Sequence, residues 1–286
     1  LVVDIALNPV LILGLGPAPR LGIAGSGIAS LMASAVSVLA FLWIIYERDL
    51  PIRLRGAELR FLKPKKELSS VILRKGAPMG LQMIVMSFSA IVMIGMINAI
   101  GTAATAAYGA INQLWTYIQM PAIAIGMAVS AMAAQNIGAK RWDRLSDIAR
   151  AGIVINLCLT GSLVLFTVLF DRLVLRLFLP HADAALDIGS RIGVIASWSF
   201  ILMGVTSVLS AVMRANGVAL APLIILIIAY IPGRLGAIFS LRPLIGDDAI
   251  WWSFPFGSAV SLALTAAYFI YGPWRQSRMI ATVEEA

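Results

Sequence analysis

Eight long apolar segments constrain the fold of this sequence more than any other feature. They cover about residues 1–16, 21–46, 68–98, 102–136, 147–170, 188–213, 218–241 and 249–272, with glycine- and proline-rich stretches between them. A helix of about 20 apolar residues suffices to cross a bilayer. Only 13% of the 286 residues are charged, whereas soluble domains carry about 25%. The sequence therefore predicts an all-α integral membrane protein, a polytopic helix bundle surrounded by the lipid bilayer.

The charged loops indicate how the segments are oriented. Cytoplasmic loops carry an excess of lysine and arginine, and one set of loops here holds most of the 22 cations. We therefore expect these loops and the C-terminus to be cytoplasmic in a multi-pass protein of the plasma membrane, the inner membrane in a bacterium. The same topology accounts for the net charge of +8, so nucleic acid is not expected as a partner. The cations on this side are Arg48, Arg53, Arg55, Arg60, Lys63, Lys65, Lys66, Arg74, Lys75, Lys140, Arg141, Arg144, Arg150, Arg214, Arg275 and Arg278.

The loop 47–67 is the only long polar connection, and it predicts a boundary between two lobes. It alternates basic residues with Leu, Ile and Phe, which suits a linker at the cytoplasmic membrane surface. We expect the last two helices of one lobe in 1–46, six helices in 68–275 and a cytoplasmic tail in 276–286. The run SAVSVLA in the second segment resembles SAVSLAL in the eighth. This similarity indicates a parallel internal repeat, unless the match of small residues is chance.

Asp4 is the only acidic residue inside a clear apolar segment. A carboxylate within the membrane is costly and is a functional candidate by default. Asn8 lies one helical turn later, and Pro9 leaves nearby carbonyl groups free for other partners. Ser26 in the next segment adds a hydroxyl. These groups suit a proton or hard-cation site, with Na⁺ as the one metal considered. The alternative is that Asp4 lies in headgroup water.

A polar stripe crosses the segment 102–136. Tyr108, Asn112, Trp115 and Gln119 fall on one narrow face of a helix at 100° per residue. Polar groups have no partner among lipid tails, so this face is expected to line a protein cavity that holds the substrate. Pro121 follows the stripe and removes a backbone donor, which predicts a kink or hinge there.

Three further patterns leave alternatives open. Gln82 lies on a methionine-rich face that is either a flexible binding surface or a helix seam, and we keep Gln82 as a cavity candidate. Small hydroxyls on the segment 188–213 favour packing over binding. Arg234 either snorkels to the outer interface or pairs with an unseen partner. The methionines are Met79, Met83, Met86 and Met93, and the 188–213 face carries Ser199, Met203, Thr206 and Ser210.

Catalytic and metal chemistry find little support in the sequence. Cys158 lies in an apolar run and is expected to pack as a small hydrophobic residue. His181 is expected to be a solvated loop residue, because no second His is available as a metal ligand. Nucleotide-binding loops, nucleophile elbows and HExxH motifs are not found. We therefore expect a secondary transporter that is no enzyme and needs no cofactor beyond a coupling ion.

Five runs of the sequence together carry a family pattern: ALNPVLILGLG, IAGSGIAS, RKGAPMGLQ, MPAIAIGMAVSAMAAQNIGAKRWDR and VMRANG. With them the chain resembles the multidrug and toxic compound extrusion (MATE) family of cation-coupled antiporters. The resemblance implies twelve helices in two six-helix lobes, of which this chain supplies helices five to twelve. The chain opens inside an apolar run without a methionine, so the missing N-terminal helices of the same protein are expected partners. The resemblance also implies export of small organic, often cationic, compounds in exchange for Na⁺ or H⁺ by alternating access.

The sequence departs from the family pattern at three places. Asp4 and Asn8 occupy exchanged positions in an asparagine–aspartate pair that DinF-like members carry before the proline. Family acids in helices seven and ten are replaced around Ser87 and Met203, so a carboxylate site in the second lobe is not expected.

The alternative function is that of a flippase of the same superfamily, which moves lipid-linked precursors across the membrane. It would favour a cationic cavity for a pyrophosphate, and apart from the undecided Arg234 the apolar segments offer little for one.

Overall fold

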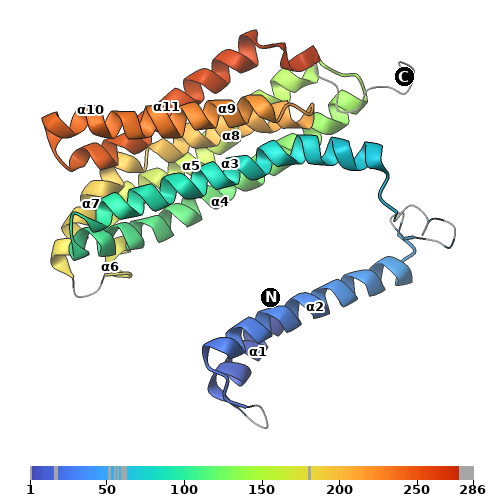
Figure 1. The fold of residues 1–286 in the computed structure, drawn as a ribbon, viewed down its shortest axis with the longest axis horizontal. Helices are drawn as coiled ribbons and strands as arrows, with labels where there is room; N and C mark the ends of the chain where they lie inside the picture. Colours follow the sequence, from blue (N-terminus) through green and yellow to red (C-terminus); the bar gives the residue numbers. More distant parts are fainter. Residues whose placement is uncertain are drawn as a thin grey trace. The chain divides into compact units, whose positions relative to one another are not determined.

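The regular elements of this chain are helices throughout the part that the structure, a computed structural model, describes (Figure 1). It describes residues 2–15, 19–50, 53–54, 56, 58, 63–179 and 182–276. The chain divides into two compact units, Leu1–Lys66 and Glu67–Ala286. The prediction of an all-α fold is confirmed. His181, Arg55, Arg60, Arg278 and almost all of the expected tail lie outside the described residues.

The first unit is a pair of packed helices, α1 (Val2–Leu13) and α2 (Ile23–Glu47). The helices approach closely at Gly25, where an added Cβ would overlap the carbonyl group of Leu11. Leu21 donates a backbone hydrogen bond to that same carbonyl oxygen at 3.0 Å. A glycine at the crossing thus lets backbone contact backbone, as small residues do between membrane helices.

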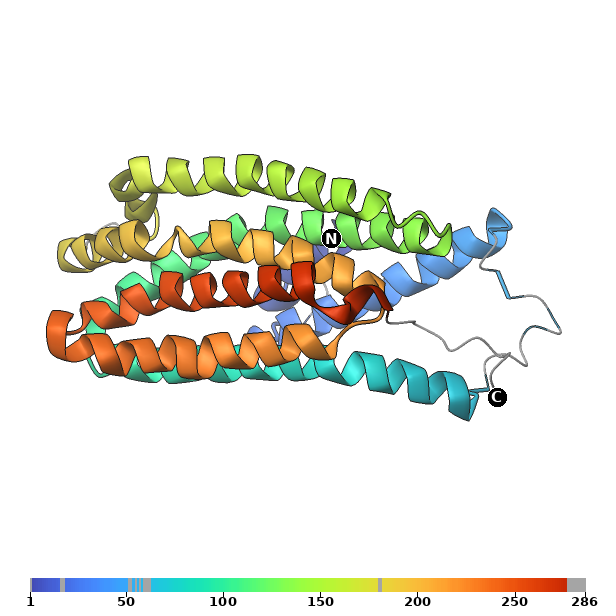
Figure 2. The ribbon, with the colours of Figure 1, turned by 90° about the horizontal axis from the view of Figure 1, so that it is seen from above.

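The second unit is a bundle of long helices that lie side by side (Figure 2). The short helices α6 and α7 (yellow) lie at one end of it, where α10 also turns into α11. Its elements are α3 (Lys66–Asn98), α4 (Thr102–Gly138), α5 (Arg144–Leu169), α6 (Asp171–Arg176), α7 (Asp183–Ala196), α8 (Ser199–Ala215), α9 (Leu220–Ile228), a π-helical segment (Ala229–Leu235), α10 (Gly236–Ile245), α11 (Asp248–Tyr271) and a 3₁₀ turn (Pro273–Gln276).

The described helices fit a membrane-spanning protein. Among the described residues α2, α3, α4, α5 and α11 are each long and apolar enough to cross a bilayer, and so is the continuous stretch of α9, the π-helical segment and α10. The bent pair α7–α8 makes a seventh if it counts as one span. Many large apolar side chains point outward, as expected of surfaces that contact lipid, including Phe41, Trp43, Leu159, Phe166 and Leu173. Cys158 also lies on this exposed surface. The described helices of this unit therefore do not supply the packing that is expected of Cys158 as a small hydrophobic residue.

Two expected segments are not simple helices. The predicted segment 188–213 is α7 and α8, bent by 42° at Ser197 and Trp198. It begins earlier than predicted, at Asp183, and its first turns carry the exposed Asp183 and Asp187 beside the buried Ala185 and Leu186. Arg172 pairs with Asp187 there at 2.9 Å. The predicted segment 218–241 is interrupted by the π-helical segment, which contains Pro232.

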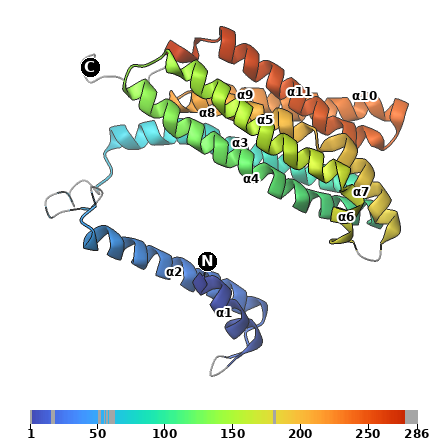
Figure 3. The same cartoon turned by 180° about the vertical axis from the view of Figure 1, so that it is seen from behind.

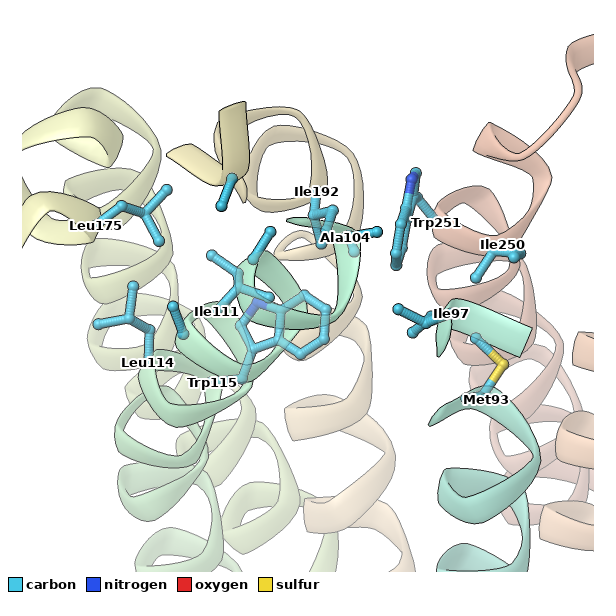
Figure 4. Close-up of a cluster of buried hydrophobic side chains, with 14 of the residues drawn as sticks. Met93, Ile97, Ala104, Ile111, Leu114, Trp115, Leu175, Ile192, Ile250 and Trp251 are labelled. Atoms are coloured by element: carbon cyan, nitrogen blue, oxygen red, sulfur yellow. The ribbon is translucent and has the colours of Figure 1, made fainter. Parts of the chain in front are cut away.

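Two buried apolar clusters hold the second unit together. One lies where α4, α5 and α8 pack against each other, and it includes Val129, Leu145 and Val208. Figure 3 shows α4 and α5 side by side. The other cluster joins α3, α4, α6, α7 and α11 near the end with the α10–α11 turn. Its members labelled in Figure 4 are Met93, Ile97, Ala104, Ile111, Leu114, Trp115, Leu175, Ile192, Ile250 and Trp251.

Candidate functional site

A cavity of about 160 Å³ lies inside the second unit, beside the second apolar cluster. Its walls come from α3, α4, α8, the π-helical segment and α11. Arg234 is the one charged residue among those that line it, and the others are polar, aromatic or small. The lining residues are Met86, Ala90, Tyr108, Asn112, Trp115, Gln119, Ser199, Phe200, Met203, Tyr230, Arg234, Phe254, Gly257 and Ser258.

The polar stripe of α4 forms one wall of this cavity. Tyr108, Asn112, Trp115 and Gln119 are all among its lining residues, as their spacing of three to four residues on one helix face allows. Trp115 is only 2% exposed, and its Nε1–H donates to Ser197 Oγ at 3.1 Å. This bond fixes the indole ring against the bend between α7 and α8. Contact between the stripe and a substrate stays a prediction.

Aromatic rings surround Trp115. Its ring centroid lies 5.0 Å from that of Phe254 and 5.2 Å from that of Phe200. Tyr108 meets Trp115 edge to face at 6.0 Å. These separations are in the range at which aromatic pairs attract each other. The cavity therefore has flat, rigid walls on the sides formed by α4, α8 and α11.

Arg234 projects inward and is 8% exposed. Its Cζ lies 3.6 Å from the centroid of the Phe254 ring and 5.8 Å from that of Tyr230. Among the described residues no carboxylate forms an ion pair with Arg234, and its buried Nε has no hydrogen-bond partner. Burial of the side chain argues against the snorkelling alternative. Pairing of Arg234 with an unseen partner stays a prediction.

Local backbone structure explains how a charged side chain turns inward here. Pro232 has no N–H, so the α-helical hydrogen-bond pattern is interrupted and the chain forms the π-helical segment instead. Gly257 faces this segment from α11, and an added Cβ there would lie 3.2 Å from both Arg234 Cβ and Ala229 O. Glycine at 257 thus leaves room for the stem of Arg234. Single-turn π-helical segments inside α-helices often occur at functional sites.

The other residues of the second unit that the sequence singles out differ in whether they line the cavity. Gln82 is not among the cavity-lining residues, and its Nε2 instead lies 3.5 Å from Ala219 O. Ser199 and Met203 line the cavity, whereas the sequence favours helix packing for their face. Pro121 lies within α4, which remains one helix from Thr102 to Gly138. Its role as a hinge stays a prediction.

Methionines of α3 divide between three environments. Met93 is fully buried in the apolar cluster, Met86 lines the cavity, and Met79 and Met83 are exposed on the outer surface. The face is thus neither a continuous binding surface nor a continuous seam.

α3 is also linked to the turn after α8 near its first turns. Lys75 Nζ donates a hydrogen bond to Gly217 O at 2.8 Å.

The carboxylate of the first unit has a hydroxyl partner that the sequence analysis missed. Ser30 Oγ donates to Asp4 Oδ1 at 3.2 Å, and Asn8 Nδ2 donates to the backbone oxygen of Asp4 at 3.0 Å. Ser26 is half-buried one turn before Ser30 on α2. The four-residue spacing of Ser26 and Ser30 was a signal that both could face α1.

Comparisons with known proteins agree with this fold. A model of the MatE family matches residues 78–237. The probable multidrug resistance protein YoeA of Bacillus subtilis is 37% identical over 99% of this chain and 61% of its own length. The probable multidrug resistance protein NorM of Thermotoga maritima is 22% identical over 98% of this chain and 60% of its own.

Solved structures show the same fold. A MATE crystal structure in complex with MaL6 has a TM-score of 0.82 at 21% identity, covering 97% of this chain and 61% of its own. A MOP superfamily transporter from Pyrococcus furiosus has a TM-score of 0.84 at 21% identity, covering 98% and 61%. The predicted MATE-like helical fold is confirmed. The chain spans about 60% of the length of the relatives and structures that it matches.

Proposed function

Since this chain belongs to the MatE family, we propose that the full-length protein is a secondary active exporter of small organic compounds and not an enzyme. The observation that supports this most directly is the cavity inside a bundle of apolar helices, lined by polar and aromatic side chains from five elements. Such a site suits binding and release of a small molecule within the membrane.

We propose the following division of the chain within that exporter. Residues 1–46 form the last two helices of the N-lobe, 47–67 an inter-lobe linker, 68–275 the six-helix C-lobe and 276–286 a cytoplasmic tail. The compact units Leu1–Lys66 and Glu67–Ala286 are compatible with this division. The concentration of cations in the loops next to the C-terminus supports a cytoplasmic C-terminus in the plasma membrane. Alternating access of the two lobes would carry the substrate across.

The coupling ion, Na⁺ or H⁺, is proposed to visit Asp4. The carboxylate lies on the short apolar helix α1, with the Ser30 hydroxyl on one of its oxygens. The amide nitrogen of Asn8 is engaged by the backbone, which leaves its amide oxygen available to a cation. Carboxylate, amide and hydroxyl oxygens are the ligands that hard cations prefer. Ser26, half-buried on α2, is the further hydroxyl of this proposed site.

The charge of the substrate is a separate question. The resemblance implied organic cations, but the charged residue that lines the described cavity is Arg234. A guanidinium repels a cation and attracts an anion. We therefore propose export of small organic compounds and do not propose that these compounds are cations.

A flippase for lipid-linked precursors is the second candidate, and Arg234 in the cavity is the observation that favours it. A pyrophosphate carries more negative charge than one guanidinium neutralises, and the other lining residues are uncharged. We therefore rank this function second. Expression of the full-length protein in a flippase-deficient strain separates the two, since the exporter proposal predicts that growth is not restored.

Transport in reconstituted vesicles tests the exporter proposal. The full-length protein is placed in proteoliposomes loaded with a panel of radiolabelled aromatic compounds that includes anions, neutral molecules and cations. Efflux should accelerate when an inward Na⁺ or H⁺ gradient is imposed and should stop when an ionophore collapses it. Efflux that is equal with and without either gradient would contradict secondary transport.

A further inference from the structure

We propose that the cavity around Arg234 binds a small aromatic carboxylate, with the guanidinium as the partner of its charge. The cavity itself is an observed feature of the fold. Only the step from bound compound to exported substrate rests on the proposed function. The inference reverses the charge that the resemblance implied for the substrate.

The charge balance of the cavity carries the argument. Arg234 is 8% exposed, and among the described residues no acid pairs with it. A buried ion loses its hydration, and only a well-placed counter-ion or hydrogen bonds offset that loss. The Phe254 ring at 3.6 Å offsets part of it through a cation–π contact. The part that remains favours an anion at the guanidinium.

The free donors of Arg234 define the anion's shape. A guanidinium presents its N–H groups in a planar fork that matches the two oxygens of a carboxylate. No described residue accepts a hydrogen bond from this fork, and Nε is buried without a partner. Tyr108 and Asn112 line the same cavity, so a hydroxyl and an amide are also available to carboxylate oxygens.

The walls and the volume define the rest of the ligand. Trp115, Phe200 and Phe254 supply aromatic surface on which a ring can stack. An engineered apolar cavity of about 150 Å³ holds one benzene molecule, and this cavity measures about 160 Å³. The cavity therefore has room for one aromatic ring with a carboxylate attached.

Three compounds of nearly equal size separate charge from shape. Benzoate is an anion, benzamide is neutral and benzamidine is a cation at neutral pH. Isothermal titration calorimetry on the purified full-length protein in nanodiscs should show benzoate binding at least about tenfold more tightly than benzamide. Benzamidine should neither bind measurably nor displace benzoate. This series uses the unaltered protein, so it does not depend on whether a variant folds.

Variants of two arginines then locate the site. Arg234→Gln should weaken benzoate binding by at least about tenfold and leave benzamide binding unchanged, while Arg234→Lys retains part of the benzoate affinity. Arg242→Gln is the matched control, because Arg242 lies two turns further along, is exposed and pairs with Asp247 at 3.4 Å. Its benzoate affinity should equal that of the unaltered protein.

Binding of benzamidine as tight as that of benzoate would overturn the inference, as would equal benzoate affinity in the unaltered protein and a folded Arg234→Gln variant. These titrations are equilibrium measurements without a gradient. Benzoate binding without gradient-driven efflux would therefore overturn the exporter proposal alone. Gradient-driven efflux of other compounds without benzoate binding would overturn this inference alone.

Discussion

The guanidinium of Arg234 lies over the ring of Phe254, with Cζ 3.6 Å from the ring centroid. This contact joins the π-helical segment to α11 at the wall of the cavity. The ring also lies 5.0 Å from that of Trp115 on α4. One phenylalanine thus connects the buried charge to the polar stripe, and Gly257, one turn further along α11, gives the arginine stem its space.

Replacing Phe254 with leucine should destabilise the protein. A leucine keeps apolar contact but removes the cation–π attraction, which contributes about 2 kcal/mol where the cation is desolvated. Unfolding of the purified protein in detergent, followed by circular dichroism, measures the loss. Phe256→Leu is the control, because Phe256 is 50% exposed on the same helix. Equal stability losses in the two variants would show that the contact with Arg234 contributes nothing.

Gly204 on α8 should not tolerate a methyl group. An added Cβ there would overlap the amide of Asn156 on α5, which is fully buried. Overpacking of this kind destabilises by about 1–3 kcal/mol, so Gly204→Ala should lower the midpoint of thermal unfolding. Gly161→Ala on α5 is the control, since an added Cβ there meets no atom within 4 Å.

A second substitution sharpens this test. Asn156→Ala removes the atoms that the new methyl group would meet, so the double variant should be more stable than the sum of the single effects predicts. If the stability losses of Gly204→Ala and Asn156→Ala simply add in the double variant, the overlap between the new methyl group and Asn156 does not cause the loss.

Asn216 should stabilise the end of the bundle near the C-terminal 3₁₀ turn. Its Nδ2 donates to Trp274 O at 2.7 Å, and both residues are buried. Asn216→Ala leaves that carbonyl oxygen without its partner, which costs about 1–3 kcal/mol. Asn136→Ala removes only a local bond to Met132 O on an exposed part of α4 and should change stability much less. A loss confined to Asn136→Ala would contradict this account.

The features that the sequence predicts well are those that depend on helical periodicity and hydropathy. The apolar segments become helices because a backbone in lipid must satisfy its own hydrogen bonds. Tyr108, Asn112, Trp115 and Gln119 line one cavity because their spacing places them on one face of α4. Both results follow from local geometry.

Features that depend on contacts between helices could not be predicted. Arg234 turns inward because a π-helical segment and Gly257 on another helix make room for it. Ser30 is the residue that contacts Asp4 because of the register between α1 and α2, which a helical wheel does not contain. Gln82 faces Ala219 instead of the cavity for the same kind of reason.

Gradient-driven efflux in an Asp4 variant tests the central claim most directly. Proteoliposomes containing the full-length protein, its Asp4→Asn variant or the control Asp147→Asn are compared under the same inward cation gradient. Asp147 is an exposed residue in the first turn of α5. The account predicts that Asp4→Asn slows efflux by at least about tenfold without loss of folded protein, while Asp147→Asn exports at the unaltered rate. Unchanged gradient-driven efflux in a folded Asp4→Asn variant would contradict it.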